Sequence, residues 1–131
     1  MDKAKVLIVD DDPDITEAMK VVLENNNYVV SNAGGIEQAL ESLKQELPDI
    51  IILDVMMNTP HDGFILSRQL KQDDNYKNIP ILMLTGVQEK TGIDFKSAAG
   101  DESWLPVEEY LSKPVKPDVL LKKVEELLKK P

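Results

Sequence analysis

The chain has 131 residues, a formal charge of −9 and no cysteine. Its length suits one domain with a substantial core, and the lack of cysteine excludes a disulfide framework and thiolate catalysis. The chain has 24 acidic and 15 basic residues. This acidic excess disfavours direct binding to nucleic acid and indicates that cations or a basic partner bind instead. The first apolar run is too short for a signal peptide or a membrane span, so we expect a soluble cytoplasmic protein.

The chain opens with an apolar run, "KVLIV" at 5–9, which predicts a strand and leads directly into four aspartates. Asp12 has the position of a helix N-cap, Pro13 that of the first helical residue, and Asp14 lies in the first turn, where the helix dipole favours anions. The apolar residues expected to face the core are Ile15, Ala18, Met19, Val22 and Leu23. Asp10 and Asp11 remain unexplained, because one polar residue would be enough to close the strand.

Strand-like runs and helical periodicity then alternate along the rest of the chain. The further predicted strands are 28–32, 49–53, 79–84 and 109–112. The further predicted helices are one around Ile36, Ala39, Leu40 and Leu43, one over 63–72, and a last one burying Leu120, Leu121, Val124, Leu127 and Leu128. Apolar strands separated by helices predict an α/β fold, a doubly wound five-stranded parallel sheet in the order 2-1-3-4-5 within a three-layer sandwich.

In such a sheet, ligands bind beyond the carboxyl ends of the strands. The chemically active residues at these ends are Asp10 and Asp11 after the first strand, Asp54 after the third, Thr85 after the fourth and Lys113 after the fifth. In the predicted order these four strands are contiguous. The second strand, at the outer edge, ends in Ser31 and Asn32 and offers no charge.

This set of side chains predicts a phosphoryl-transfer chemistry. Clustered carboxylates repel one another unless a cation lies among them, and a set of oxygen ligands suits Mg²⁺. With the charge neutralised, one carboxylate can attack phosphorus and form an aspartyl phosphate. Thr85 and Lys113 would then stabilise the negative oxygens of the phosphoryl group.

The segments "VDDD", "ILDVMM", "DGF", "MLTG" and "SKP", in this order, closely resemble the CheY-like receiver domain of two-component response regulators. The resemblance covers nearly the whole chain and implies a single receiver domain over 1–131. It implies that Asp54 is the phosphoacceptor. Asp10, Asp11 and Asp54, with the backbone carbonyl of Met56, would bind Mg²⁺ or Mn²⁺.

The resemblance implies further roles near the ends of the last two strands. Thr85 matches the hydroxyl residue that contacts the phosphoryl group, and Lys113 matches the lysine that does the same. Thr85 and Tyr110 fall at the switch positions of the family. Pro114 matches the proline that follows the lysine and is normally cis.

Two segments depart from the family pattern. The loop "MMNTPHDGF" is one residue longer than the usual sequence after the phosphoacceptor. The interval 86–109 is also longer and contains Gly92, Gly100 and Pro106 where the fourth helix is expected. Glycine and proline disrupt helices, so we expect this helix to be short, shifted or partly unwound.

The resulting hypothesis is a signalling switch that receives its phosphoryl group from a sensor histidine kinase or a phosphotransfer protein and then changes its binding surface. It would catalyse only its own phosphorylation and dephosphorylation. An interaction module that is never phosphorylated is an alternative, although the full set of acids, threonine and lysine argues against it. A phosphatase with an aspartate nucleophile is a second alternative, but such an enzyme usually has another acid two residues after the nucleophile, where this chain has Met56. A flavin carrier is a further alternative, but its phosphate-binding loop should follow the first strand, where this chain has three aspartates that would repel a phosphate.

Overall fold

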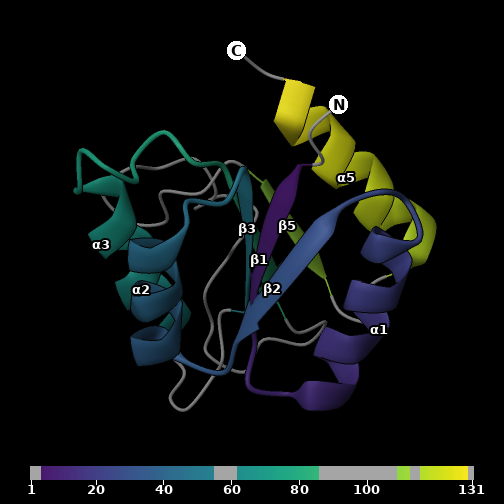
Figure 1. Ribbon diagram of the computed structural model, residues 1–131, viewed down its shortest axis with the longest axis horizontal. Coiled ribbons are helices and arrows are strands. Elements are labelled where there is room, and N and C mark those ends of the chain that lie inside the picture. Colours follow the sequence, from purple (N-terminus) through teal and green to yellow (C-terminus); the bar gives the residue numbers. More distant parts are fainter. Residues whose placement is uncertain (1–3, 55–61, 86–108, 113–115, 130–131) are drawn as a thin grey trace.

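The computed structural model describes residues 4–54, 62–85, 109–112 and 116–129. They form a parallel sheet between two layers of helices (Figure 1). The strands are β1 (Lys5–Val9), β2 (Val29–Ala33), β3 (Ile50–Asp54), β4 (Ile81–Thr85) and β5 (Glu109–Ser112). The helices are α1 (Pro13–Glu24), α2 (Ile36–Gln45), α3 (Asp62–Lys71) and α5 (Pro117–Lys129).

The strand order is β2-β1-β3-β4-β5, with every neighbouring pair parallel. This confirms the predicted α/β fold and the predicted order. β3 is buried along its whole length, as expected for a strand with neighbours on both sides and helices on both faces. β2 lies at the edge, and its residues are mostly exposed.

The sheet separates two hydrophobic cores because successive side chains of a strand point to opposite faces. Leu7 and Val9 of β1 pack with residues of α2 and α3, whereas Val6 and Ile8 pack with residues of α1 and α5. Figure 1 shows these two helix pairs on opposite sides of the sheet. Each fully buried aliphatic side chain contributes about 1.5–3 kcal/mol, so β1 and β3 are firmly held between the layers.

The helix α1 begins as predicted but is rotated relative to the expected face. Its buried residues are Thr16, Met19 and Leu23, whereas Ala18 is exposed, so the prediction that Ala18 faces the core was wrong. At about 100° per residue, Ala18 lies roughly 130° from the centre of the face formed by the three buried residues. The apolar spacing identified a hydrophobic face of the helix but not which residue lies at the centre of that face.

Some predicted features lie outside the described residues. They include the longer loop after Asp54 and the irregular fourth-helix segment at 86–108. Within the ranges that are described, no helix has the length and apolar character needed to cross a membrane.

Candidate metal and phosphoacceptor site

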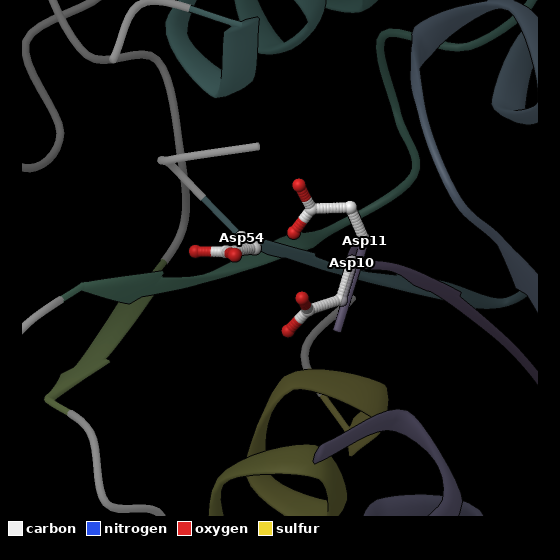
Figure 2. Close-up of side chains that lie close together, drawn as sticks. All are labelled: Asp10, Asp11 and Asp54. Atoms are coloured by element: carbon white, nitrogen blue, oxygen red, sulfur yellow. The ribbon is translucent and has the colours of Figure 1, made fainter. Parts of the chain in front are cut away.

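Three carboxylates meet at the carboxyl edge of the sheet, as predicted. Asp10 and Asp11 follow β1 directly, and Asp54 is the last residue of β3. The two strands are hydrogen-bonded neighbours, with Val9 opposite Leu53, which brings their ends together. One carboxylate oxygen from each aspartate lies within 4.8 Å of the corresponding oxygens of the other two (Figure 2).

The burial of this cluster makes the gathering of like charges costly. The side chains of Asp10 and Asp54 are buried, with 4% and 3% of the residue exposed, whereas Asp11 is exposed. At the effective dielectric of a protein site, two negative charges at this separation repel by about 3 kcal/mol. A divalent cation replaces that repulsion by attraction to all three groups.

Hydrogen bonds hold Asp10 at both its backbone and its side chain. Its backbone N–H donates to the carbonyl of Ala33 at 3.0 Å, at the end of the β1–β2 pairing. Its Oδ1 accepts a hydrogen bond from the backbone N–H of Asp12 at 2.9 Å. The Asp10 carboxylate is therefore oriented by the fold rather than left to rotate.

The donor set fits a small hard cation. Mg²⁺ is usually bound through one or two carboxylates, prefers oxygen ligands and keeps several waters. The three aspartates supply only oxygen atoms, and the exposure of Asp11 leaves one side of the cluster open to solvent. The chemistry of the three residues therefore suits Mg²⁺ or Mn²⁺.

The other predicted site residues are placed only in part. Thr85 ends β4, the neighbour of β3, so its backbone lies on the strand next to that of Asp54. Tyr110 lies in β5 opposite Met83 of β4. Met56, Lys113 and Pro114 lie outside the described residues, and their roles stay predictions.

The sequence interpretation missed the link between the N-cap of α1 and the acidic cluster. The sequence predicts that Asp12 is a helix cap, and its side chain does accept hydrogen bonds from the N–H groups of Asp14 and Ile15. Its backbone N–H, however, donates to Asp10. The signal available in the sequence was the spacing, with the capping residue only two positions after a strand-end aspartate.

The comparison with known families identifies the domain. The sequence profile of the response regulator receiver domain matches residues 6–125. The chain belongs to the receiver domain family. This confirms the resemblance, and the matched region is a receiver domain, which is a signalling domain rather than a classical enzyme.

Individual relatives agree with this assignment. The receiver domain is 35% identical over 126 residues to the alkaline phosphatase synthesis transcriptional regulatory protein PhoP of Bacillus subtilis, covering 96% of this chain and 49% of PhoP. It is 30% identical to protein PilH of Pseudomonas aeruginosa, with 95% of this chain and 98% of PilH covered. A crystal structure assigned as a response regulator from Chloroflexus aurantiacus superposes with a TM-score of 0.84 at 33% identity, covering 98% and 99% of the two chains.

The lengths of the relatives differ from one another. The chain spans about half the length of the first curated relatives that it matches, at 49%, 49% and 46%. PilH, in contrast, is covered almost completely. The receiver domain thus occurs among these relatives both as part of a longer protein and as nearly the whole chain.

Proposed function

We propose that this receiver domain is a phosphorylation switch of a two-component phosphorelay, acting in the cytoplasm. Asp54 would accept the phosphoryl group from the phosphohistidine of a sensor histidine kinase or a phosphotransfer protein. The observation that supports the proposal is the meeting of the Asp10, Asp11 and Asp54 carboxylates at the edge of two central strands. A protein has little reason to gather three carboxylates there unless a cation and an anionic reactant bind beside them.

The three aspartates would have different roles. Asp10 and Asp11, together with Asp54 and the backbone carbonyl of Met56, would hold Mg²⁺ or Mn²⁺. The bound ion would neutralise the carboxylates and stabilise the charge on the phosphoryl oxygens. A carboxylate oxygen of Asp54 would form the new bond to phosphorus as the bond from phosphorus to the histidine nitrogen breaks, and the imidazole would leave carrying the electron pair.

Residues of β4 and of the segment around β5 would complete the switch. The hydroxyl of Thr85 and the ammonium group of Lys113 would donate hydrogen bonds to the phosphoryl oxygens. Tyr110 would change its position in response to Thr85, and the surface around β5 would change with it. Pro114, next to Lys113, would help to fix the position of the lysine.

The domain would extend over residues 1–131, and its output would come from another part of a longer protein or from a separate partner. Among the relatives, PhoP is named a transcriptional regulatory protein and is about twice as long as the matched region. We assign no direct contact with nucleic acid to the receiver domain itself, because its formal charge is −9.

A phosphoryl donor of low molecular weight tests the proposal without knowledge of the kinase. Incubation with acetyl phosphate and Mg²⁺ should add one phosphoryl group, detected by mass spectrometry of the intact protein. Asp54→Asn and an excess of chelator should each abolish the addition. Asp49→Asn serves as the control and should be modified like the wild type, because Asp49 lies at the amino end of β3 whereas Asp54 lies at its carboxyl end.

Two results would contradict the proposal. Undiminished addition in Asp54→Asn would move the phosphoacceptor to another residue. Absence of modification in the wild type at saturating acetyl phosphate and Mg²⁺ would favour an interaction module that is never phosphorylated.

A further inference from the structure

We infer that Asp12 is a positioning residue for the cation site, which it serves by holding the carboxylate of Asp10 through its own backbone N–H. The inference rests on the proposed function, because it assigns to Asp12 a part in cation binding at the same cluster. Asp12 is not a ligand in this inference. It acts through Asp10 and through the first turn of α1.

One hydrogen bond connects Asp12 directly to the cluster. The backbone N–H of Asp12 donates to Oδ1 of Asp10 at 2.9 Å. A hydrogen bond to an ionised acceptor is roughly twice as strong as a neutral one, so it fixes the direction of the Asp10 carboxylate. The cluster in Figure 2 includes Asp10, whose orientation depends on this bond.

Three other hydrogen bonds fix Asp12 itself to α1. Its Oδ1 accepts from the N–H of Asp14 at 3.0 Å and from that of Ile15 at 3.3 Å. Its backbone carbonyl accepts from the N–H of Thr16 at 3.1 Å. The backbone of Asp12 is extended, with φ −94° and ψ 107°, as an N-cap residue requires.

The helix to which Asp12 is tied is itself firmly placed. Met19 and Leu23 of α1 are buried in the core between the sheet and the helices α1 and α5. The packing of α1 fixes the position of the helix, and the cap hydrogen bonds tie Asp12 to the first turn of that helix. Loss of the cap would release Asp12 from this turn and, with it, the donor that orients Asp10.

The expected size of the effect follows from other metal sites. Residues that orient a metal ligand typically change metal affinity 10–100-fold when mutated. Asp10 keeps its second support, the hydrogen bond from its N–H to the carbonyl of Ala33, in every variant of Asp12. We therefore expect a loss of about tenfold, at the lower end of that range.

The charge of Asp12 offers a competing explanation, because a nearby carboxylate also attracts cations. Asp12 is only partly buried, so solvent and salt screen its charge. Asparagine keeps the capping oxygen and removes the charge. Asp12→Asn therefore separates orientation from electrostatic attraction.

The experiment is a titration with Mn²⁺, followed by electron paramagnetic resonance of the free ion, on the wild type and three variants. Asp12→Ala should bind about tenfold more weakly than the wild type. Asp12→Asn should stay within about threefold. Ala18→Gly, at an exposed position of the same helix, should lower the resistance to urea as Asp12→Ala does but bind Mn²⁺ like the wild type.

Each outcome decides the matter. The inference fails if Asp12→Ala binds like the wild type, if Asp12→Asn loses as much affinity as Asp12→Ala, or if Ala18→Gly loses the same affinity. If the wild type binds no Mn²⁺, the cation site of the proposed function fails and the inference with it. Binding by the wild type with unchanged binding by Asp12→Ala overturns the inference alone.

Discussion

Charged groups are arranged differently at the amino ends and at the carboxyl ends of the parallel strands, which are called the amino edge and the carboxyl edge of the sheet. At the amino edge, the ammonium group of Lys5 lies 3.0 Å from the carboxylate of Glu46, and the backbone N–H of Lys5 donates to Asp49 at 2.7 Å. At the carboxyl edge, the carboxylates of Asp10, Asp11 and Asp54 lie within 4.8 Å of one another. Among the described residues, an ion pair lies at the amino edge and a cluster of three carboxylates at the carboxyl edge.

The comparison separates residues that stabilise the fold from residues that prepare it to bind. Lys71 near the amino edge donates from Nζ to the carbonyls of Lys77 at 3.1 Å and Ile79 at 3.0 Å, which holds the segment leading into β4. The carboxylates of the acidic cluster instead repel one another, and a bound cation would relieve that repulsion.

The largest expected effect comes from removing one charge from the carboxyl edge. Asp54→Asn should raise the free energy of unfolding in the presence of a chelator, by at most about 3 kcal/mol, because it removes the repulsion between Asp54 and the carboxylates of Asp10 and Asp11. Urea denaturation measures the change. Mg²⁺ should stabilise the wild type by binding only the folded state, and it should stabilise the variant much less.

Glu46→Gln makes the same chemical change at the amino edge and should have the opposite sign. The Lys5–Glu46 pair is exposed, with 44% and 59% of the two side chains accessible, so its loss should cost no more than about 1 kcal/mol. If both substitutions shift stability in the same direction, the contrast between the edges is wrong.

The next largest effect should follow from Lys71→Met. The substitution leaves the carbonyls of Lys77 and Ile79 without a charged donor and should lower the free energy of unfolding by about 2 kcal/mol. Lys77→Met is the matched control. Lys77 forms an exposed ion pair with Asp74 at 3.2 Å, so its loss should cost about 0.5 kcal/mol or less. Equal losses in urea would show that Lys71 is an ordinary surface lysine.

A smaller effect is expected at the turn between α1 and β2. Asn27 has a positive φ of 72°, a conformation that glycine adopts without a steric penalty. The N–H groups of Asn27 and Tyr28 donate to the carbonyls of Glu24 and Leu23 at 3.2 and 3.1 Å, which closes the helix end. Asn27→Gly should raise the free energy of unfolding in urea by about 0.5–1 kcal/mol, and Asn27→Ala should lower it. A loss of stability with glycine would contradict this explanation.

The smallest effect concerns alkaline pH. Burial raises the pKa of Tyr28, and the nearby carboxylate of Glu125 raises it further. The unfolded chain releases this proton near pH 10, whereas the folded protein retains it to higher pH. The contribution of Tyr28 to stability is therefore present below about pH 10 and is lost as the pH rises toward the folded pKa.

Tyr28→Phe should make the fall of stability above pH 10 less steep than in the wild type, as measured by urea denaturation at a series of pH values. Glu125→Gln should have the same effect to a smaller extent, because it removes the second cause and leaves burial. Identical slopes in the wild type and Tyr28→Phe would exclude Tyr28 as a source of the pH dependence.

The fold was predictable because its signals are local and repeated. The strands β1, β3 and β4 are largely apolar runs of the printed sequence, and the helices between the strands show the 3.6-residue periodicity of amphipathic helices. The acidic cluster was predictable for a topological reason: the carboxyl ends of neighbouring parallel strands share an edge. Asp10, Asp11 and Asp54 could therefore be brought together without coordinates.

What escaped prediction involves backbone atoms. The acceptors for Lys71 are carbonyl oxygens, which every residue possesses, and the donor to Asp10 is the amide of Asp12. Asn27 adopts its positive φ because the helix end requires it, and asparagine has other common uses in turns. The exposure of Ala18 depends on the rotation of α1 by a fraction of a turn. These features depend on the positions of individual atoms, which cannot be read from the pattern of residue types.

The parallel pairing of β1 also has a consequence for the order of assembly. Val6 pairs with Val30 in β2, 24 residues away, and with Ile50 in β3, 44 residues away. Loop-closure entropy alone makes the longer connection costlier by about 0.5 kcal/mol, which favours formation of the β1–β2 contact before the β1–β3 contact. That contact ends in the bond from Asp10 to Ala33. The backbone of Asp10 is thus supported by the shorter connection, whereas the longer one brings Asp54 to the cluster.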